Sequence, residues 1–415
     1  NISRLMLDLK IHALGLGYSG ISLATLNRLL LFSEKDLVPV IPSRGSVGAS
    51  GDLAPLAHLS LPLLGLGYFW ETCESSQVAA SDVLDREGIE PIELGAKDGL
   101  SLINGTQFMC AYGAWILERA IHLLKVCDVV AAMSLEALQG SLRPFDPRVQ
   151  AVRPHPGQVM VAGNVRKLLL HSEIMESHRD CGKVQDPYCL RCVPQVHGAS
   201  RDGLAYAGQV VETEINSVTD NPLVFENGDI ISGGNFHGQP LALALDFAAI
   251  ALAELANISE RRTYLLLGGH DGLPRLLMQE TGINSGFMIP QYTAASLVSE
   301  NKVLCHPASV DSIPTSLGQE DHVSMGSISA LKLLQVFKNV EMVIAIEMFT
   351  ASQALDFRLP LKPGRGVEVA HEFIRSRVPH RSEDYYFKED LNSCSDLVRD
   401  AALLEAVSES MGGLD

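Results

Sequence analysis

The residues with the clearest chemical potential form the tripeptide Ala49-Ser50-Gly51. Attack of the Gly51 amide nitrogen on the carbonyl carbon of Ala49, with loss of water, would close a five-membered imidazolone ring. Loss of the Ser50 hydroxyl would then add an exocyclic methylidene group, which is an electrophile. Gly51 suits this reaction because it has no Cβ to block the approach of its nitrogen to a carbonyl two residues earlier. Three small residues also mark ordinary turns, so the tripeptide alone does not establish this chemistry.

The sequence around and beyond the tripeptide resembles the aromatic amino acid ammonia-lyase and aminomutase family. The matching segments are GSVGASGDLAPLAH (45–58), GLSLINGTQ (99–107), FDPR (145–148), RPHPGQ (153–158) and ISGGNFHG (231–238). Two more, VQDPYCLRC (184–192) and QEDHVSMG (319–326), are similar to the branch of this family that acts on histidine. The resemblance covers nearly the whole chain. It implies a 4-methylideneimidazol-5-one (MIO) cofactor formed autocatalytically from Ala49, Ser50 and Gly51, with no external cofactor.

The resemblance also implies a reaction, the non-oxidative elimination of ammonia from L-histidine to give urocanate, the first step of histidine degradation. This elimination removes a barely acidic β-proton next to a poor leaving group. An electrophile helps because it takes up the amino group and makes the nitrogen a better leaving group while a base removes the proton.

The matching segments suggest roles for several side chains. Arg191 is expected to bind the substrate carboxylate, because a planar guanidinium offers two charge-assisted hydrogen bonds. Tyr188 is expected to act near the ring, and Asn104 to bind the ring or the carboxylate. Gln185 resembles a family residue that contacts the imidazole, and Phe236 resembles one that forms a wall of the pocket. The alternatives are an ordinary ion pair for Arg191, a packed core aromatic for Tyr188 and a turn residue for Asn104.

Glu320 is the residue expected to select the substrate. The histidine branch carries Gln-Glu at Gln319 and Glu320, where the phenylalanine and tyrosine branches commonly carry Asn-Gln. A carboxylate suits an imidazole because it can accept the ring N–H or stabilise an imidazolium, whereas an unpaired buried carboxylate opposes a benzene ring. The alternative for Glu320 is a structural salt bridge.

Two other functions remain open. One is a different aromatic amino acid ammonia-lyase or an aminomutase, which Glu320 opposes. The other is a catalytically impaired fragment that acts only as a scaffold. The sequence begins at Asn1 and runs directly into a helical pattern, so the family's N-terminal segment, with its proton-abstracting tyrosine and substrate-contacting histidine, is expected to be absent.

Composition narrows the class of partner. The chain has 415 residues, of which 47% are hydrophobic and 20% charged, enough to bury a large core. A net charge of −17, from 32 basic and 49 acidic residues, opposes nonspecific nucleic-acid binding and favours a small-molecule substrate. The eight cysteines are spread out, as in a reduced, cytoplasmic protein. Cys189 and Cys192 have C-x-x-C spacing without a second ligand pair, so no metal site is predicted.

The pattern of apolar residues predicts a mainly α fold, a bundle of long helices. One long helix has a face made of Leu241, Leu245, Ala248, Leu252 and Leu255, and a second runs from about Ser327 to Leu355. Charged residues interrupt both, so they are expected in a core and not across a membrane. We expect one large domain over residues 1–415, with a cofactor-loop region at 1–110, a central bundle at 111–360 and a C-terminal helical region at 361–415.

The resemblance implies a homotetramer whose active sites are shared between subunits. In such an assembly, the apolar faces of the two long helices are expected to be buried between subunits, because a monomer would expose large apolar patches.

Overall fold

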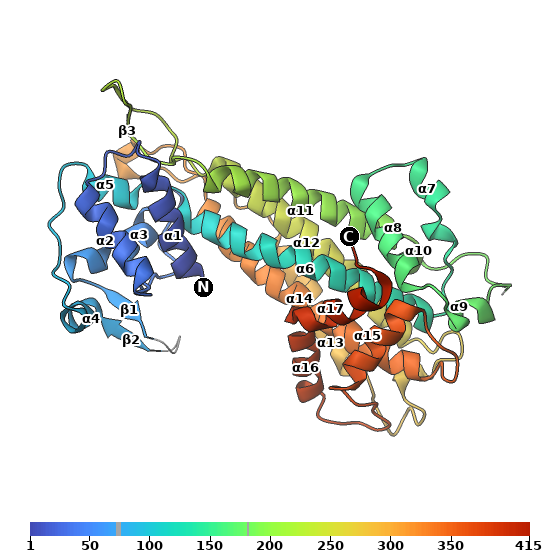
Figure 1. Ribbon diagram of the computed structural model, residues 1–415. Helices are drawn as coiled ribbons and strands as arrows, with labels where there is room; N and C mark the ends of the chain where they lie inside the picture. Colours follow the sequence, from blue (N-terminus) through green and yellow to red (C-terminus); the bar gives the residue numbers. More distant parts are fainter. Residues whose placement is uncertain (72–75, 181) are drawn as a thin grey trace. The chain divides into compact units, whose positions relative to one another are not determined.

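The computed structural model describes residues 1–71, 76–180 and 182–415. The described chain is mainly α-helical, which confirms the predicted fold class, and its strands form short antiparallel hairpins (Figure 1). The described residues divide into two compact units, each made of separate stretches of the chain. The first unit contains residues 1–117, 206–247 and 306–334, and the second contains residues 118–205, 248–305 and 335–415.

The first unit holds the shorter helices of the N-terminal region and both hairpins. Its helices are α1 (Ile2–Gly15), α2 (Leu23–Glu34), α3 (Leu53–Ser60), α4 (Ala80–Glu87) and α5 (Asp98–Ile103), with 3-10 turns at Leu61–Leu64 and Ser316–Gly318. Strands β1 (Tyr68–Trp70) and β2 (Gln77–Ala79) pair with Phe69 opposite Val78, and β3 (Leu223–Val224) pairs with β4 (Ile230–Ile231).

The second unit holds the other short and medium helices. They are α7 (Pro147–Ala151), α8 (Pro156–Leu168), α9 (Glu173–Ser177), α10 (Tyr188–Arg191), α13 (Met288–Leu304), α15 (Arg365–Arg375), α16 (Lys388–Arg399) and α17 (Ala401–Met411), with 3-10 turns at Arg143–Phe145 and Arg275–Leu277.

Each long helix has one end in the first unit and the other end in the second unit. These helices are α6 (Gln107–Ala137), α11 (Val193–Ile215), α12 (Gln239–Leu266) and α14 (Gly326–Asp356). Figure 1 shows them running alongside one another. Unit boundaries therefore fall inside helices and do not follow the consecutive regions 1–110, 111–360 and 361–415. The single large domain stays a prediction.

In the first unit, small residues let the long helices approach closely. A Cβ on Gly113 of α6 would lie 3.0 Å from a Leu245 methyl group on α12 and 3.1 Å from a Val211 methyl group on α11. Glycine at this position therefore allows a close approach of α6 to both neighbours.

In the second unit, buried charges tie the same helices together. Arg262 of α12 and Glu347 of α14 are fully buried and form a bidentate pair at 2.5 and 2.8 Å. Ser134 of α6 donates to the same carboxylate at 2.6 Å. His197 of α11 contacts Asp128 of α6 at 2.9 Å, and burial lowers the pKa of His197, which favours its neutral form. Removing one partner would leave an uncompensated buried charge, so loss of either side chain would be strongly destabilising.

Helix α12 corrects one expectation about subunit contacts. The predicted apolar face is already buried by other residues of this chain, so no second subunit is needed to cover it. Its members are Leu241, Leu245, Ala248, Leu252 and Leu255. A second face of the helix, with Leu243, Phe247 and Ile250, stays exposed. The 3.6-residue period identified an apolar face correctly but could not say which chain covers it, because intrachain and interchain packing require the same side chains.

Among the described residues, α12 is also the helix whose length and hydropathy would allow it to cross a membrane. Within its most apolar window, 72% of the residues are buried inside the protein, as expected for a core helix.

Candidate active site

The Ala49-Ser50-Gly51 tripeptide forms a tight left-handed turn directly before α3. Ser50 has φ of 50° and Gly51 has φ of 82°. The turn is braced by Gly105, whose carbonyl oxygen accepts a hydrogen bond from the Asp52 N–H at 2.7 Å and whose N–H donates to the Ser50 carbonyl at 3.4 Å. A Cβ on Gly51 would overlap the Gly105 carbonyl. The backbone around Gly51 therefore leaves room only for glycine, and the residues present fit the ring predicted from this tripeptide.

Replacing Gly51 by alanine should prevent this turn from forming. The new methyl group adds a backbone overlap to left-handed strain, so we expect a loss of about 3 kcal/mol or more in the free energy of unfolding. Gly88 is the matched control, because it has φ of 66° with no atom within 4 Å of an added Cβ. Gly88→Ala should cost only about 1 kcal/mol. Urea unfolding of both variants checks the difference, and equal losses would contradict the bracing role of Gly105.

The loop that carries the tripeptide is fastened to the segment that follows Glu320. The Met325 N–H donates to the Val47 carbonyl at 3.0 Å, and the Ser327 hydroxyl donates to the Ser46 carbonyl at 2.8 Å. Ala49 packs in a small apolar cluster with Val323 and Met325. These contacts bring together two segments that are far apart in the sequence.

As a result, Glu320 meets Ser50 directly. The Ser50 hydroxyl donates to Glu320 Oε1, while Oε2 accepts from the hydroxyls of Thr315 at 2.9 Å and Ser316 at 2.6 Å. Hydrogen bonds from Ser316 and Ser50 lower the pKa of the Glu320 carboxyl below its ordinary value. Among the described residues, hydroxyl groups and not the basic side chain of a structural salt bridge therefore hold an ionised carboxylate beside the tripeptide.

Asp52 is a site residue that the sequence analysis missed. Its side chain is fully buried, and one carboxylate oxygen accepts from the N–H groups of Phe108 and Met109 at 3.1 Å each, at the start of α6. Burial raises the pKa of Asp52 to about 7, although these N–H groups oppose the shift. The carboxylate thereby fixes the residue after Gly51 to a helix N-terminus, where a negative charge is favoured. In the sequence, the position of Asp52 directly before the apolar segment Leu53-Ala54-Pro55 was the feature that could have identified it as a site residue.

Asn104 lies on the other side of the turn, at the C-terminal end of α5. Its amide nitrogen donates to the Asn221 carbonyl at 3.2 Å, while its Oδ1 atom is buried and has no hydrogen-bond partner in the described chain. An unpaired buried oxygen is unusual and leaves a free acceptor next to the turn. Phe236 also belongs to the first unit and is half-buried, in the segment between β4 and α12.

The other predicted site residues, Gln185, Tyr188 and Arg191, belong to the second unit. Tyr188 begins α10 and is 71% exposed, so it is not a packed core aromatic. The Arg191 guanidinium lies 4.6 Å from the Tyr188 ring centroid, and its Nε atom is buried without a hydrogen-bond partner among the described residues. Gln185 is exposed. Next to it, buried Asp186 accepts from the Ser141 N–H at 2.6 Å and so fixes this segment.

The structure therefore groups the predicted residues into two sets. The first unit holds Ala49, Ser50, Gly51, Asn104, Phe236 and Glu320, and within it Glu320 contacts the tripeptide directly. In the part of the chain that the structure describes, no group of three or more His, Cys, Asp or Glu side chains could hold a metal ion, and Cys189 and Cys192 are free thiols.

Comparison with known proteins agrees with the helical fold. A family model described as aromatic amino acid lyase matches residues 1–376. The chain therefore belongs to the aromatic amino acid lyase family.

Its relatives place it near the branch of that family that acts on histidine. A histidine ammonia-lyase from Sorangium cellulosum is 55% identical, over 99% of this chain and 81% of that protein. The crystal structure of histidine ammonia-lyase from Trypanosoma cruzi is 44% identical with a TM-score of 0.92, over 99% of this chain and 78% of that one. The crystal structure of tyrosine aminomutase from Streptomyces globisporus is 35% identical with a TM-score of 0.93, over 100% of this chain and 82% of that one. These matches confirm the family and branch predicted from the sequence motifs.

Proposed function

We propose that this protein eliminates ammonia from L-histidine to give urocanate, using an MIO ring formed from Ala49, Ser50 and Gly51. The family and the identity to histidine ammonia-lyases support a carbon–nitrogen lyase. The observation that carries the histidine assignment is the contact between ionised Glu320 and Ser50. The Glu320 carboxylate provides a negative charge beside the reacting group. This charge can accept an N–H from an imidazole or stabilise an imidazolium, whereas a benzene ring offers it no donor.

In the proposed mechanism, each of the following side chains has one role. The ring supplies an electrophilic methylidene carbon for the amino group of the substrate. Arg191 binds the substrate carboxylate, because its guanidinium offers paired N–H donors. Glu320 accepts the imidazole N–H through Oε1, while Thr315 and Ser316 keep Oε2 fixed. Asn104 is proposed to bind the ring or the carboxylate through its amide N–H donors, and its unpaired Oδ1 can accept from the substrate amino group.

Gln185, Phe236 and Tyr188 complete the proposed site with less specific support. Gln185 is proposed to contact the imidazole and Phe236 to form a pocket wall. Tyr188 is proposed as a catalytic residue near the ring. Its exposure and its stacking with Arg191 make its hydroxyl available to a bound substrate.

A direct assay tests the function. Purified full-length protein is incubated with L-histidine, L-phenylalanine or L-tyrosine, and urocanate, cinnamate and coumarate are measured by absorbance and chromatography. Urocanate from histidine is the expected product. Formation of cinnamate, coumarate or a β-amino acid instead would replace this proposal with another ammonia-lyase or an aminomutase. The absence of any product from a folded protein would favour the scaffold alternative.

Arg191→Lys should raise KM for histidine by roughly 10- to 100-fold, because lysine keeps the charge but loses the paired donors that a carboxylate uses. The rate at saturating histidine should fall much less. Arg179→Lys is the control, since Arg179 is an exposed partner of Glu176 on the same unit. Steady-state kinetics check both variants, and an unchanged KM for Arg191→Lys would contradict carboxylate binding.

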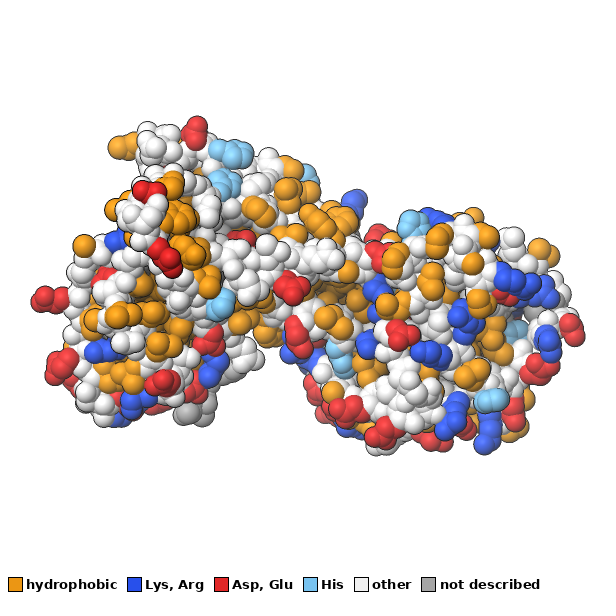
Figure 2. Space-filling model, turned by 45° about the horizontal axis from the view of Figure 1, so that its top comes forward, with side chains coloured by type: hydrophobic (Ala, Val, Ile, Leu, Met, Phe, Trp, Pro, Cys, Tyr) orange, Lys and Arg blue, Asp and Glu red, His pale blue; other side chains and the backbone are white. Residues whose placement is uncertain are grey.

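We also propose a homotetramer with shared active sites. On α12, the side chains of Leu243, Phe247 and Ile250 are 51%, 45% and 41% exposed at helical spacing, an apolar face that a partner can cover. Figure 2 shows hydrophobic side chains lying among acidic and basic ones over the visible surface. Phe247→Asp should weaken assembly, whereas Glu405→Gln, at an exposed position of α17 away from this face, should not. Sedimentation and size-exclusion chromatography measure the result, and a well-behaved wild-type monomer would contradict the proposal.

We propose a cytoplasmic location because the cysteines described in the structure are free thiols. Cys110, Cys127 and Cys394 are buried and free, as expected where thiols are kept reduced.

A further inference from the structure

Lys10 is a buried lysine next to the candidate site. It lies on α1, and only 1% of its surface is exposed. Its amine donates to the backbone carbonyl of Asn104 at 2.5 Å and, more weakly, to the Gln107 side-chain oxygen at 3.4 Å. These acceptors are neutral amide oxygens and not a carboxylate. Burying an amine on neutral partners is costly, and an apolar side chain of the same length would avoid that cost.

The charges around Lys10 are held by other partners. Lys97 forms an ion pair with Asp220 at 2.8 Å and also donates to Ser101 at 3.0 Å. Asp52 is bound to the start of α6. Burial lowers the pKa of Lys10 to about 7, Asp220 and Asp52 oppose that shift, and Lys97 adds to it. The amine keeps an N–H for the Asn104 carbonyl in either protonation state.

The acceptor of Lys10 leads directly to the tripeptide. The carbonyl of Asn104 and the N–H of Gly105 belong to one peptide group, and that N–H donates to the Ser50 carbonyl at 3.4 Å. A donor at the carbonyl end of a peptide polarises it and strengthens the hydrogen bond that its N–H makes. Lys10 and Ser50 are therefore linked through a single peptide group.

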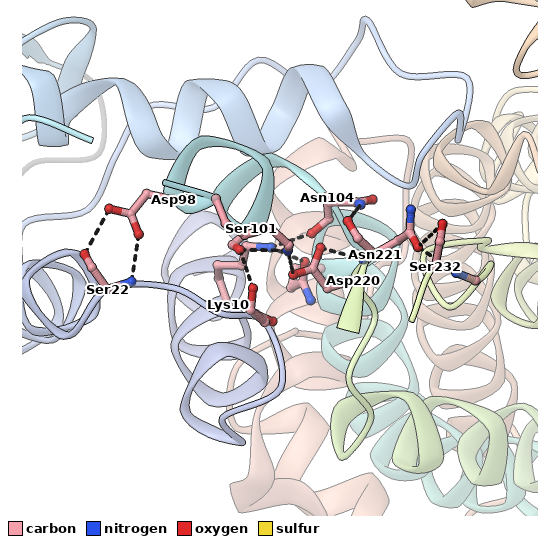
Figure 3. A network of polar contacts seen from close by, with 12 residues as sticks. Lys10, Ser22, Asp98, Ser101, Asn104, Asp220, Asn221 and Ser232 are labelled. Atoms are coloured by element: carbon pink, nitrogen blue, oxygen red, sulfur yellow. Dashed lines mark hydrogen bonds and ion pairs between the residues drawn. The ribbon is translucent and has the colours of Figure 1, made fainter. Parts of the chain in front are cut away.

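Figure 3 shows Lys10 and Asn104, the first part of this link, within a wider polar network. Asn104 connects on its far side to Asn221, which accepts from the Ser232 hydroxyl at 3.1 Å, while Asp220 is bound by Lys97. The network joins α1 and α5 to the segment that leads to Phe236. Lys10 is the member whose amine contacts the backbone bracing the tripeptide.

We propose that Lys10 is a positioning residue for the reaction, which holds and polarises the Asn104–Gly105 peptide so that its N–H withdraws electron density from the Ser50 carbonyl. The proposal rests on the proposed function, because the Ser50 carbonyl becomes part of the ring. A more electron-poor ring is a better electrophile for the substrate amine. Lys10 acts through the peptide and does not itself contact the substrate.

The test uses Lys10→Met, which keeps a long side chain and removes the donor. Lys125→Met is the matched control, because Lys125 is a partly buried lysine of the second unit that also donates to a backbone carbonyl, that of Leu414, at 2.8 Å. For each protein we measure ring content from intact mass, kcat and KM per ring, and the rate at which borohydride reduces the ring. Lys10→Gln is measured in parallel, so that the comparison stands if Lys10→Met does not fold.

The expected result for Lys10→Met is a kcat per ring about tenfold lower, a KM within about twofold and slower reduction by borohydride. Lys10→Gln should lose at least about threefold in kcat per ring, and Lys125→Met should match the wild type. A purely structural role predicts lower stability with wild-type kcat and ring reactivity, and that result would overturn the proposal. A wild-type protein without a ring or without urocanate formation would instead refute the proposed function, so the two failures are distinguishable.

Discussion

Ser50→Ala should reduce urocanate formation by about 10³-fold or more, because the variant lacks the hydroxyl whose loss creates the electrophile. The wild-type protein should weigh two water molecules less than its sequence predicts, and the variant should not. Intact mass spectrometry and the histidine assay measure the two effects on the same samples.

The control for this variant is Ser393→Ala, in α16 of the second unit, where the hydroxyl donates only to the Glu389 carbonyl at 3.0 Å. It should keep both the mass deficit and the activity. Because alanine and serine are similar in size, Ser50→Ala should also keep the stability of the wild type within about 1 kcal/mol. Activity within tenfold of the wild type, or a wild-type mass without the deficit, would contradict the MIO assignment.

Glu320→Gln should lower kcat/KM for histidine by about 10²-fold or more. The amide keeps the shape of the side chain but removes the negative charge that accepts or stabilises the imidazole. Turnover of phenylalanine, if measurable, should not fall and can rise, because an unpaired carboxylate no longer faces the benzene ring.

Glu320 also contacts Ser50, so its effect on ring formation must be separated from its effect on the substrate. Dividing each rate by the ring content from intact mass makes that separation. The exposed Glu405 of α17 provides the control variant Glu405→Gln, which should behave as the wild type. A kcat/KM per ring that stays at the wild-type value would show that Glu320 does not select histidine.

Much of the helical structure was predictable, because local pattern is enough for long helices. The predicted helix from Ser327 to Leu355 matches α14 within one residue at each end. The apolar face from Leu241 to Leu255 lies in α12 as expected. Its burial inside the chain was not predictable, since the pattern does not identify the partner.

Single-residue roles were harder to predict than elements. Asp52 lies at an ordinary helix start and Lys10 on an ordinary helix face, and the local pattern does not identify the distant groups that these side chains contact. Their roles follow from contacts with Phe108 and Asn104, which lie 56 and 94 residues away in the sequence. Thr315 and Ser316 were missed for a different reason. Their hydroxyls are informative only once Glu320 is known to face Ser50.

The family, the candidate cofactor tripeptide and the types of side chain available could be predicted from the amino-acid sequence, because each of these depends on residues close together in the chain. The folded structure was needed to show that Glu320 contacts Ser50, 270 residues away in the sequence, and that Gly105 lies so close to Gly51 that no Cβ fits. It also decided which carboxylates and amines are buried. These outcomes depend on how distant segments pack, and packing sets both the distances between charges and their exposure to water.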